Sequence, residues 1–477
     1  RPGCGSYRPL HRINLVDWRI HSDGVSNMSR PVRFLHTADI HLGTPVQGFS
    51  GASRQIEAQL MEASFVAWER ICDAALAYDV DFVVVAGDLY HREARSVKAA
   101  RCLKEQVQRL GKAGIMVYAV YGNHDPLGDR EELLDMPENF HAFPAETSTF
   151  YEVKHNGIPL ARVFGVSYRS RRESRRLSTM LSPPDNTLIN IGLLHTALDP
   201  ENRNYSPCSM QDLLEEKYVH YWALGHIHQS RIIRSGFPSI VFPGTPQGRH
   251  PGEVGVGGCL LVEVSLDKAP DIRFVPISPF VWQKIELSIA EPLEGAVVAN
   301  MSDVERLFQE KAEELLEKPA AQVGPVEIPL ADTPWEPEGY LVRWVLTGRG
   351  MAHTALTESE HATDELLGCL EEFQYHKPFI WTESIQLQIA KPLPEWAEMV
   401  ESWPLARQLE GIAASCLDDE KMQKELEKAL GRIWETDYDP EHPSLYTLPA
   451  TPEVRTHILK AAKQLAYEKL LEGGRVP

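Results

Sequence analysis

Apolar residues along this chain occur either in short continuous runs or in longer stretches with helical spacing. The short runs, typical of buried strands, lie at 32–36, 82–86, 115–120, 148–154, 160–166, 188–194 and 221–224. The stretches at 53–78 and 96–112 predict two helices that separate the first three strands. This strand–helix–strand order implies crossover connections and a largely parallel sheet. Shorter runs then predict antiparallel strands at 230–234, 238–243, 257–265 and 271–277.

The pattern changes near residue 280, which indicates a second domain. Strands are predicted at 282–290, 339–347 and 379–389, helices at 302–317 and 361–375, and a proline-rich loop at 324–337. From residue 392 onward the chain is predicted to be largely helical, at 395–434 and 453–472. We therefore expect a first domain over 28–281, a smaller α+β domain over 282–391 and a helical region over 392–477. Residues 1–27 show no clear period and precede Met28, so we expect an upstream extension, with a disordered native tail as the alternative.

Composition and charge narrow the class of protein. The 477 residues are 43% hydrophobic and 24% charged, as in soluble globular proteins, and no apolar stretch approaches the roughly 20 residues of a membrane span. Seven scattered cysteines form no C-x-x-C pair, which favours a reducing, cytoplasmic location. Of the net charge of −19, −18 falls on residues 283–477, so the first domain is the better suited to meet a phosphate backbone.

Polar side chains follow the predicted strands at the points where they end. They are Asp39, His41, Asp88, Asn123, His124, His195, His226 and His228, the last two in a Gly-His-x-His motif. Each motif alone is typical of a solvated turn, but five in succession favour a shared site where the carboxyl ends of strands converge. Carboxylate and amide oxygens mixed with imidazoles suit Mn, Fe or Zn. The set is too large for one divalent ion, and two ions can clamp an in-line displacement at phosphorus.

This series of motifs resembles the calcineurin-like metallophosphoesterase superfamily. The resemblance implies an α/β/β/α sandwich, with the smaller α+β domain as a cap and the helical region after it. It also implies that Asp39, His41 and His228 hold one metal ion. Asn123, His195 and His226 would hold the other ion, and Asp88 would bridge the two. His124 would act on the phosphate or on the leaving oxygen rather than as a ligand.

Further motifs resemble one branch of that superfamily, the SbcD-like double-strand-break repair exonucleases, and most of all its YhaO-like members. They are Gly87-Asp88-Leu89-Tyr90-His91 and the loop at 242–250, with Gly258-Cys259 behind it. The resemblance implies 3′-to-5′ exonuclease activity on DNA, with endonuclease activity as an addition, Mn²⁺ as the metal, and a role for His91 in exonuclease action. A phosphatase or cyclic-nucleotide phosphodiesterase of the same fold, or a non-catalytic scaffold, are the alternatives.

DNA contacts and partners are further expectations. Arg249 and His250 lie beside the predicted site, and Arg171 and Arg172 belong to an arginine cluster at 169–176. A basic cluster can follow a phosphate backbone, although a solvated loop is an equal alternative. The resemblance implies an SMC-like ATPase partner, SbcC-like or YhaN-like, bound by the C-terminal helices. Helices that merely pack on the second domain are the alternative, and a homodimer is also compatible with the family.

Overall fold

The structure is a computed structural model, and it describes most of the chain between residues 30 and 419. The described residues are 30–48, 52–91, 96–129, 135–293, 295–317, 328–332, 334–392, 404–419, 421, 459, 462 and 465. They divide into two compact units. The first unit takes in the described residues within the ranges Arg1–Leu287, Met301–Leu346 and Ser359–Gln388. The second takes in those within Ser288–Asn300, Thr347–Glu358 and Ile389–Pro477.

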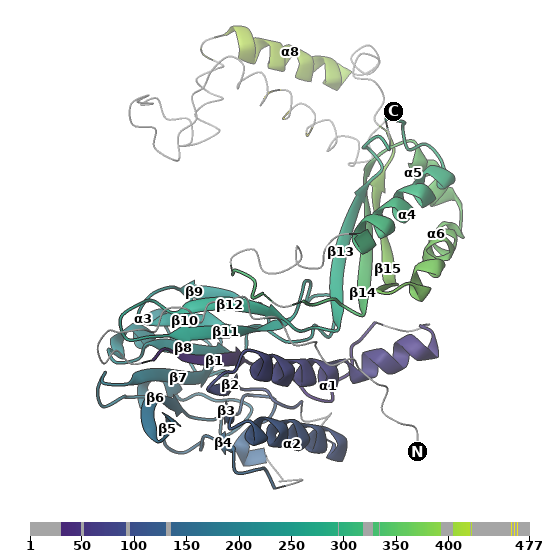
Figure 1. Ribbon diagram of the computed structural model, residues 1–477. Helices are drawn as coiled ribbons and strands as arrows, with labels where there is room; N and C mark the ends of the chain where they lie inside the picture. The colour runs from purple at the N-terminus through teal and green to yellow at the C-terminus, as the bar shows by residue number, and fades with distance from the viewer. Residues whose placement is uncertain are drawn as a thin grey trace, which may run out of the picture. The chain divides into compact units, whose positions relative to one another are not determined.

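Within the first unit, one six-stranded sheet contains the first strands of the chain (Figure 1). Its order is β12-β11-β1-β2-β3-β4, with bounds Asp271–Pro276, Gly258–Val264, Val32–Thr37, Phe82–Ala86, Met116–Val120 and Phe140–Ala142. Strands β1 to β4 run parallel, and β11 pairs antiparallel with β1. The parallel core that the alternation of strands and helices predicted is therefore present.

A second six-stranded sheet has the order β5-β6-β7-β8-β10-β9. Its strands span Thr149–His155, Ile158–Gly165, Ile189–His195, Tyr221–Gly225, Ser239–Phe242 and Arg231–Arg234. The four central strands are parallel, whereas β5 and β9 pair antiparallel at the two edges. Central parallel strands are buried on both faces, which explains why β7 and β8 appear in the sequence as mainly apolar runs without polar alternation.

The two sheets pack face to face, and alternate residues of β1 serve different layers. Phe34 lies in the inter-sheet core, where its ring stacks on that of Phe82 at 5.0 Å between centroids. Its neighbour Leu35 points to the other face, where helices α1 (Arg54–Ala77) and α2 (Val97–Lys112) cover the sheet. Each helix begins at a serine cap whose side chain accepts a backbone hydrogen bond.

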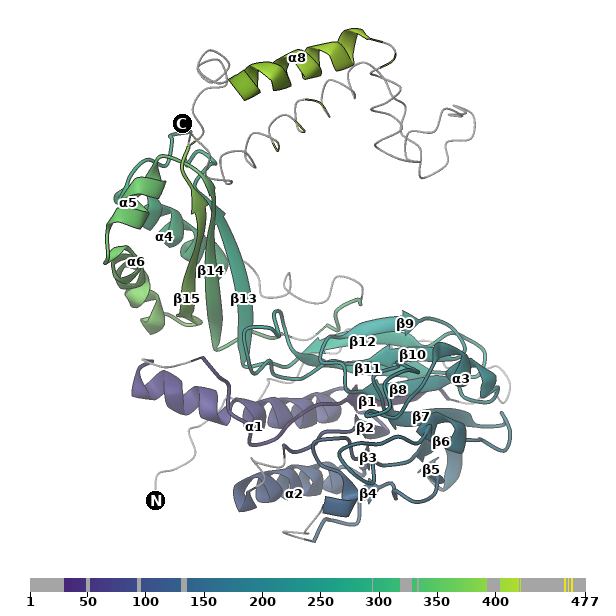
Figure 2. The same ribbon diagram turned by 180° about the vertical axis from the view of Figure 1, so that it is seen from behind.

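The outer face of the second sheet has a thinner cover (Figure 2). The short helix α3 (Met210–Glu215) and a 3₁₀ turn at Leu177–Met180 lie there. The indole nitrogen of Trp222 on β8 donates to the carbonyl of Leu213 on α3 at 3.1 Å. The sequence pattern did not predict α3, because six residues are too few to show a helical period. Its start is nevertheless encoded, by a capping box between Ser209 and Asp212.

A third, three-stranded sheet has the order β13-β14-β15. Its elements are β13 (Phe280–Ser288), α4 (Met301–Glu317), β14 (Gly339–Arg349), α5 (Ala352–Glu358), α6 (Ala362–Leu370), a 3₁₀ turn at Glu371–Tyr375 and β15 (Phe379–Ala390). Helix α4 packs on this sheet through Phe308, whose ring centroid lies 5.2 Å from that of Trp344. The predicted alternation of strands and helices is confirmed, except that α5 was not predicted.

The fold class predicted from the sequence is confirmed: a two-sheet α/β sandwich accompanied by a smaller α+β region. Helix α8 (Pro404–Asp418) makes up most of what the structure describes of the helical C-terminal region. Residues 1–27 and nearly all of 420–477 lie outside the described residues. The domain borders at 281 and 391 remain predictions.

Candidate metal centre

The predicted site residues come together where strands of both sheets end. Asp39 and His41 follow β1, Asp88 follows β2, Asn123 and His124 follow β3, His195 ends β7, and His226 and His228 follow β8. The first three of these strands belong to one sheet and the last two to the other, so the site depends on how the sheets pack. Carboxyl ends of parallel strands meet at one edge, which is why short loops suffice to bring the residues together.

Four of these residues hold a backbone conformation that non-glycine residues seldom adopt. Asp39, His41, Asp88 and His226 have φ angles of 51°, 46°, 51° and 98°. Such positions cost free energy, of order 1–3 kcal/mol each when sparsely populated, and they cluster at functional sites. The surrounding loops must therefore over-determine the direction in which these side chains point.

Backbone hydrogen bonds provide that constraint. The amide of His226 donates to Asp39 Oδ2 at 2.9 Å, and the amide of His124 donates to Asp88 Oδ1 at 3.0 Å. The Thr245 hydroxyl donates to the carbonyl of Asp39 at 3.0 Å. Each carboxylate thus has one oxygen held by a backbone amide, while its other oxygen faces the histidines.

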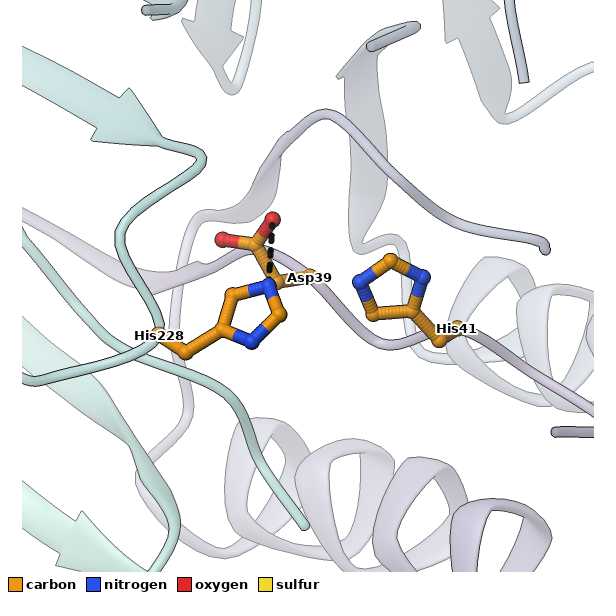
Figure 3. Close-up of side chains that lie close together, drawn as sticks. All are labelled: Asp39, His41 and His228. Atoms are coloured by element: carbon orange, nitrogen blue, oxygen red, sulfur yellow. Dashed lines mark ion pairs between the residues drawn. The ribbon is translucent and has the colours of Figure 1, made fainter. Parts of the chain in front are cut away.

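One group of donor atoms consists of Asp39, His41 and His228, which Figure 3 shows facing one another. The distance from His228 Nε2 to Asp39 Oδ1 is 3.8 Å, as is that from His41 Nε2 to Asp88 Oδ2. Asp39 Oδ1 and both ring nitrogens of His41 are buried, and among the described residues they have no hydrogen-bond partner. Buried polar atoms are normally satisfied. An ion with ligand bonds of about 2.0–2.2 Å fits between atoms at these separations.

A second group consists of Asp39, Asp88 and His195. His195 Nδ1 lies 2.9 Å from the carbonyl of Ala86, which can only accept, so Nδ1 carries the proton. In the neutral ring Nε2 then has only a lone pair, yet it faces Asn123 Oδ1 at 3.0 Å and Asp88 Oδ2 at 3.5 Å. His226 Nδ1 approaches the same Asn123 oxygen at 3.2 Å. Several acceptors facing one another in this way fit a cation between them.

The pKa values of these groups point in the same direction. Burial lowers the pKa of His195 to about 3 and that of His226 to about 4, and it lowers the pKa of His41 well below the ordinary value. These imidazoles are therefore neutral at pH 7, as metal ligands must be. Burial also raises the pKa values of Asp39 and Asp88. Two buried carboxylates beside neutral histidines form a site that a divalent cation would stabilise.

Gly122 has no side chain, and this leaves the space in which the donor atoms converge. A Cβ atom at this position would lie 2.2 Å from Asp88 Oδ1 and 2.7 Å from His195 Nε2. Both distances are shorter than any real contact of a Cβ atom. The glycine of the Gly-Asn-His-Asp motif is thus required by the approach of a carboxylate and an imidazole from two other strands.

His91 and His124 lie beside the donor groups without belonging to them. Their ring centroids are 4.4 Å apart, and those of His124 and His41 are 5.0 Å apart. Asp125, the last residue of the Gly-Asn-His-Asp motif, accepts from the amides of Gly122 at 2.8 Å and Tyr90 at 3.2 Å. It therefore connects the loop that carries His124 to the loop that carries His91.

Sequence reasoning missed Glu253, which lies next to the site. Its Oε1 lies 2.5 Å from His228 Nδ1, 3.3 Å from His250 Nε2 and 3.7 Å from Arg249 Nη2. Burial alone would raise the pKa of Glu253, but its bond with His228 and the Arg249 amide lower it to about 2. Burial likewise opposes charge on His228, but the bond with Glu253, together with the charges of Asp39 and Glu253, raises the pKa of His228. An acidic residue within an otherwise basic loop was the available signal.

The predicted DNA contacts differ in how accessible they are. Arg249 is largely buried, with 12% of its side chain exposed, whereas 48% of His250 is exposed. In the arginine cluster, Arg171 and Arg172 are exposed. Arg175 instead binds the buried Glu173 through Nε at 2.8 Å, and Arg176 pairs with Asp212. The last two arginines therefore fix the loop, and DNA binding by the other four residues stays a prediction.

A two-sheet α/β sandwich with aspartates and histidines grouped at its strand ends defines a metallophosphoesterase. The chain belongs to the calcineurin-like phosphoesterase family, whose profile matches residues 32–230. Among the described residues, no helix is long and apolar enough to cross a membrane.

Three relatives show how far the similarity extends. An uncharacterized metallophosphoesterase of Bacillus subtilis, YhaO, is 32% identical over 362 residues, covering 74% of this chain and 81% of that protein. The DNA double-strand break repair protein Mre11 of Aeropyrum pernix is 28% identical, over 54% of this chain and 64% of its own length. One component of the nuclease SbcCD of Escherichia coli is 31% identical over 22% of this chain and 24% of its own length.

Proposed function

We propose that this metallophosphoesterase is a phosphodiesterase that hydrolyses DNA with two bound divalent ions, acting as a 3′-to-5′ exonuclease and, in addition, as an endonuclease. The similarity to Mre11 and to the nuclease SbcCD supports DNA as the substrate class. The similarity to YhaO supports the phosphoesterase chemistry alone. The polarity of digestion rests on the resemblance of the Gly87 to His91 motif to the repair exonucleases.

The observation that carries this proposal is the pair formed by His91 and His124 next to the two donor groups. Seven candidate ligands are complete without either residue. Two additional imidazoles, 4.4 Å apart between centroids, offer one group for the scissile phosphate and a second for its neighbour along a chain. A phosphatase for small monoesters needs only the first, so the second favours a polynucleotide.

The donor set fits two ions, because two groups of closely spaced aspartate and histidine atoms converge from several loops. Among the described residues, Asp39 Oδ1 and both ring nitrogens of His41 are also buried without a hydrogen-bond partner. In our assignment Asp39, His41 and His228 would hold one ion, Asn123, His195 and His226 would hold the other, and Asp88 would be a ligand of both. Such ions would supply a nucleophile at neutral pH and neutralise charge on the phosphate oxygens. We propose Mn²⁺ as the metal, with Fe or Zn as alternatives, because mixed oxygen and imidazole donors suit these ions.

The other residues of the chain have separate roles in this proposal. His124 is positioned by the bond from its amide to Asp88, and its imidazole hydrogen-bonds the phosphate or gives a proton to the leaving oxygen. His91 orients the terminal nucleotide. The smaller α+β region caps the DNA, and Arg171, Arg172, Arg249 and His250 contact its backbone. The C-terminal helices bind an SMC-like ATPase.

Digestion of a 3′-labelled and a 5′-labelled DNA duplex tests this proposal. With Mn²⁺ we expect stepwise loss of nucleotides from the 3′ end, and no digestion once a chelator is added. The control is hydrolysis of bis-(p-nitrophenyl) phosphate by the same preparation. Turnover of this small diester without any digestion of DNA would contradict the nuclease and leave a phosphodiesterase of small substrates.

A further inference from the structure

We propose that Glu253 is a positioning residue that fixes the tautomer and direction of the His228 imidazole. This inference rests on the proposed metal site but concerns a residue outside the set of candidate ligands. It begins from the 2.5 Å distance between Glu253 Oε1 and His228 Nδ1. A carboxylate can only accept, so Nδ1 carries the proton, and in the neutral ring that a metal ligand requires Nε2 is left with a lone pair.

The geometry directs that lone pair into the site. His228 Nε2 faces Asp39 Oδ1 at 3.8 Å, in the donor group that also contains His41 (Figure 3). A histidine whose far nitrogen is held by a carboxylate is a stronger and better oriented ligand. His195 is held in a comparable way by the carbonyl of Ala86, so each of the two donor groups has one imidazole with a fixed proton.

Glu253 is itself held in place by hydrogen bonds other than the one to His228. Its second oxygen, Oε2, accepts from the amide of Arg249 at 2.6 Å, and its own amide donates to the carbonyl of His250 at 2.9 Å. Only 8% of its side chain is exposed, compared with 27% for His228. A buried carboxylate in a closed turn presents Oε1 in one direction, whereas a solvated glutamate would sample many.

The competing role for Glu253 is to anchor the loop through Arg249 and His250. Those two side chains lie 3.7 Å and 3.3 Å from Oε1, further away than His228. The two roles differ in what they affect. An anchor would change stability and leave metal affinity intact, whereas a positioning residue acts on metal affinity and only through His228.

Calorimetric titration of the chelator-treated protein with Mn²⁺ distinguishes these roles. For Glu253→Ala we expect one of two binding events to weaken by about 10–100-fold, the range seen when outer partners of metal ligands are removed. Glu253→Gln keeps an acceptor oxygen for His228 and should weaken binding less. Glu263→Ala is the matched control, because Glu263 pairs with Arg33 at 2.9 Å on strand β11 and should leave both events unchanged.

A double-mutant cycle with His228→Ala supplies the decisive readout. If Glu253 acts through His228, then Glu253→Ala has no further effect on Mn²⁺ affinity once His228 is gone. Equal losses in both backgrounds, or two wild-type binding events in Glu253→Ala, would overturn the inference. If Glu253→Ala does not fold, the same cycle is run with Glu253→Gln. A wild-type protein that binds no Mn²⁺ overturns the proposed metal site as well, so the two failures are distinguishable.

Discussion

The imidazoles of His91 and His124 lie with their centroids 4.4 Å apart and their planes inclined by 32°. His124 in turn lies 5.0 Å from His41, whereas His91 is 5.8 Å from it. The three ring centroids therefore form a triangle, and both His91 and His124 border the donor group that contains His41. Two imidazoles on one side of the site can meet two neighbouring parts of a substrate, as the proposed roles of His124 and His91 require.

His91→Ser should lower exonuclease activity far more than hydrolysis of a small diester. One positioned acid–base group contributes about 10²–10⁴-fold to a rate, and bis-(p-nitrophenyl) phosphate has no neighbouring nucleotide to orient. The measurement compares both activities in one preparation loaded with Mn²⁺. An equal fall in both would assign His91 to the support of the metal centre and remove the main residue-level argument for a nuclease.

Asp88→Asn should abolish hydrolysis and yet make the metal-free protein more stable. The buried carboxylate is unfavourable because burial, Asp125 and Asp39 all raise its pKa, so its charged form opposes folding at pH 7. An amide keeps an oxygen for the His124 amide and removes that cost, which we expect to raise stability by about 0.5–2 kcal/mol. Diester turnover should fall by at least about 10²-fold.

The stability half of this prediction has a defined pH dependence. The folded-state pKa of Asp88 is raised above the unfolded value. The free energy of unfolding of the wild type is therefore unaffected by Asp88 below the unfolded pKa and decreases as pH rises above it. The difference in melting temperature between Asp88→Asn and wild type should therefore shrink at acidic pH. A variant that melts below the chelator-treated wild type at pH 7 would contradict this account.

Removing and restoring metal should move the melting temperature reversibly. An ion that binds only the folded chain stabilises it by about 2.7 kcal/mol at a concentration 100 times its dissociation constant. Differential scanning calorimetry of protein treated with chelator, then titrated with Mn²⁺, measures the shift. No shift over a roughly thousandfold range of Mn²⁺ would rule out an ion that links the loops of the two sheets.

Gly122→Ala should disable the centre although it adds only one methyl group. Its Cβ would meet Asp88 and His195 at distances that force both to move, so metal binding and hydrolysis should be lost together. Gly368→Ala is the matched control, because no atom lies within 4 Å of a Cβ there and the residue belongs to helix α6. The control should gain about 0.5–1 kcal/mol of stability. A Gly122→Ala protein with full Mn²⁺ affinity would show that the donors do not converge as described.

Helix α8 offers a test of the proposed ATPase partner by substitution. Ile412 on this helix is an exposed apolar residue, with 53% of its surface accessible. Ile412→Glu should weaken capture by an SMC-like ATPase while diester hydrolysis stays at the wild-type rate. Ala414→Glu introduces the same charge about 200° further around the helix and serves as the control. Undiminished capture by Ile412→Glu would argue against this face of α8 as the docking surface.

The main elements of the fold could be predicted from the sequence because strand runs and helical spacing are strong signals. The two sheets could not be told apart from these signals, since β1 and β7 are both largely apolar and almost entirely buried. Helix α3 was not predicted, because its six residues are too few to show a helical period. The relation of β11 to β1 depends on a pairing between strands at opposite ends of the first domain, which local pattern does not encode.

The residues that form the candidate site could be predicted from the sequence. The residues that hold them in position could not. Asp88 and His195 stand at the ends of strands, where motif and position coincide. Glu253 lies in an irregular turn and is recognisable only once the turn brings it to His228. Arg249 illustrates a different limit, because a basic residue beside the site was predicted to contact DNA and its side chain is largely buried.

The hydrogen bond from the His226 amide to Asp39 joins residues 187 positions apart. Contacts at such separation form late in folding, because the entropy of closing the intervening loop must be offset first. A chain still being synthesised carries Asp39 and Asp88 long before either histidine of the Gly-His-x-His motif exists. The centre is therefore a late product of folding, and metal loading belongs after residue 228 has been made and the second sheet has docked.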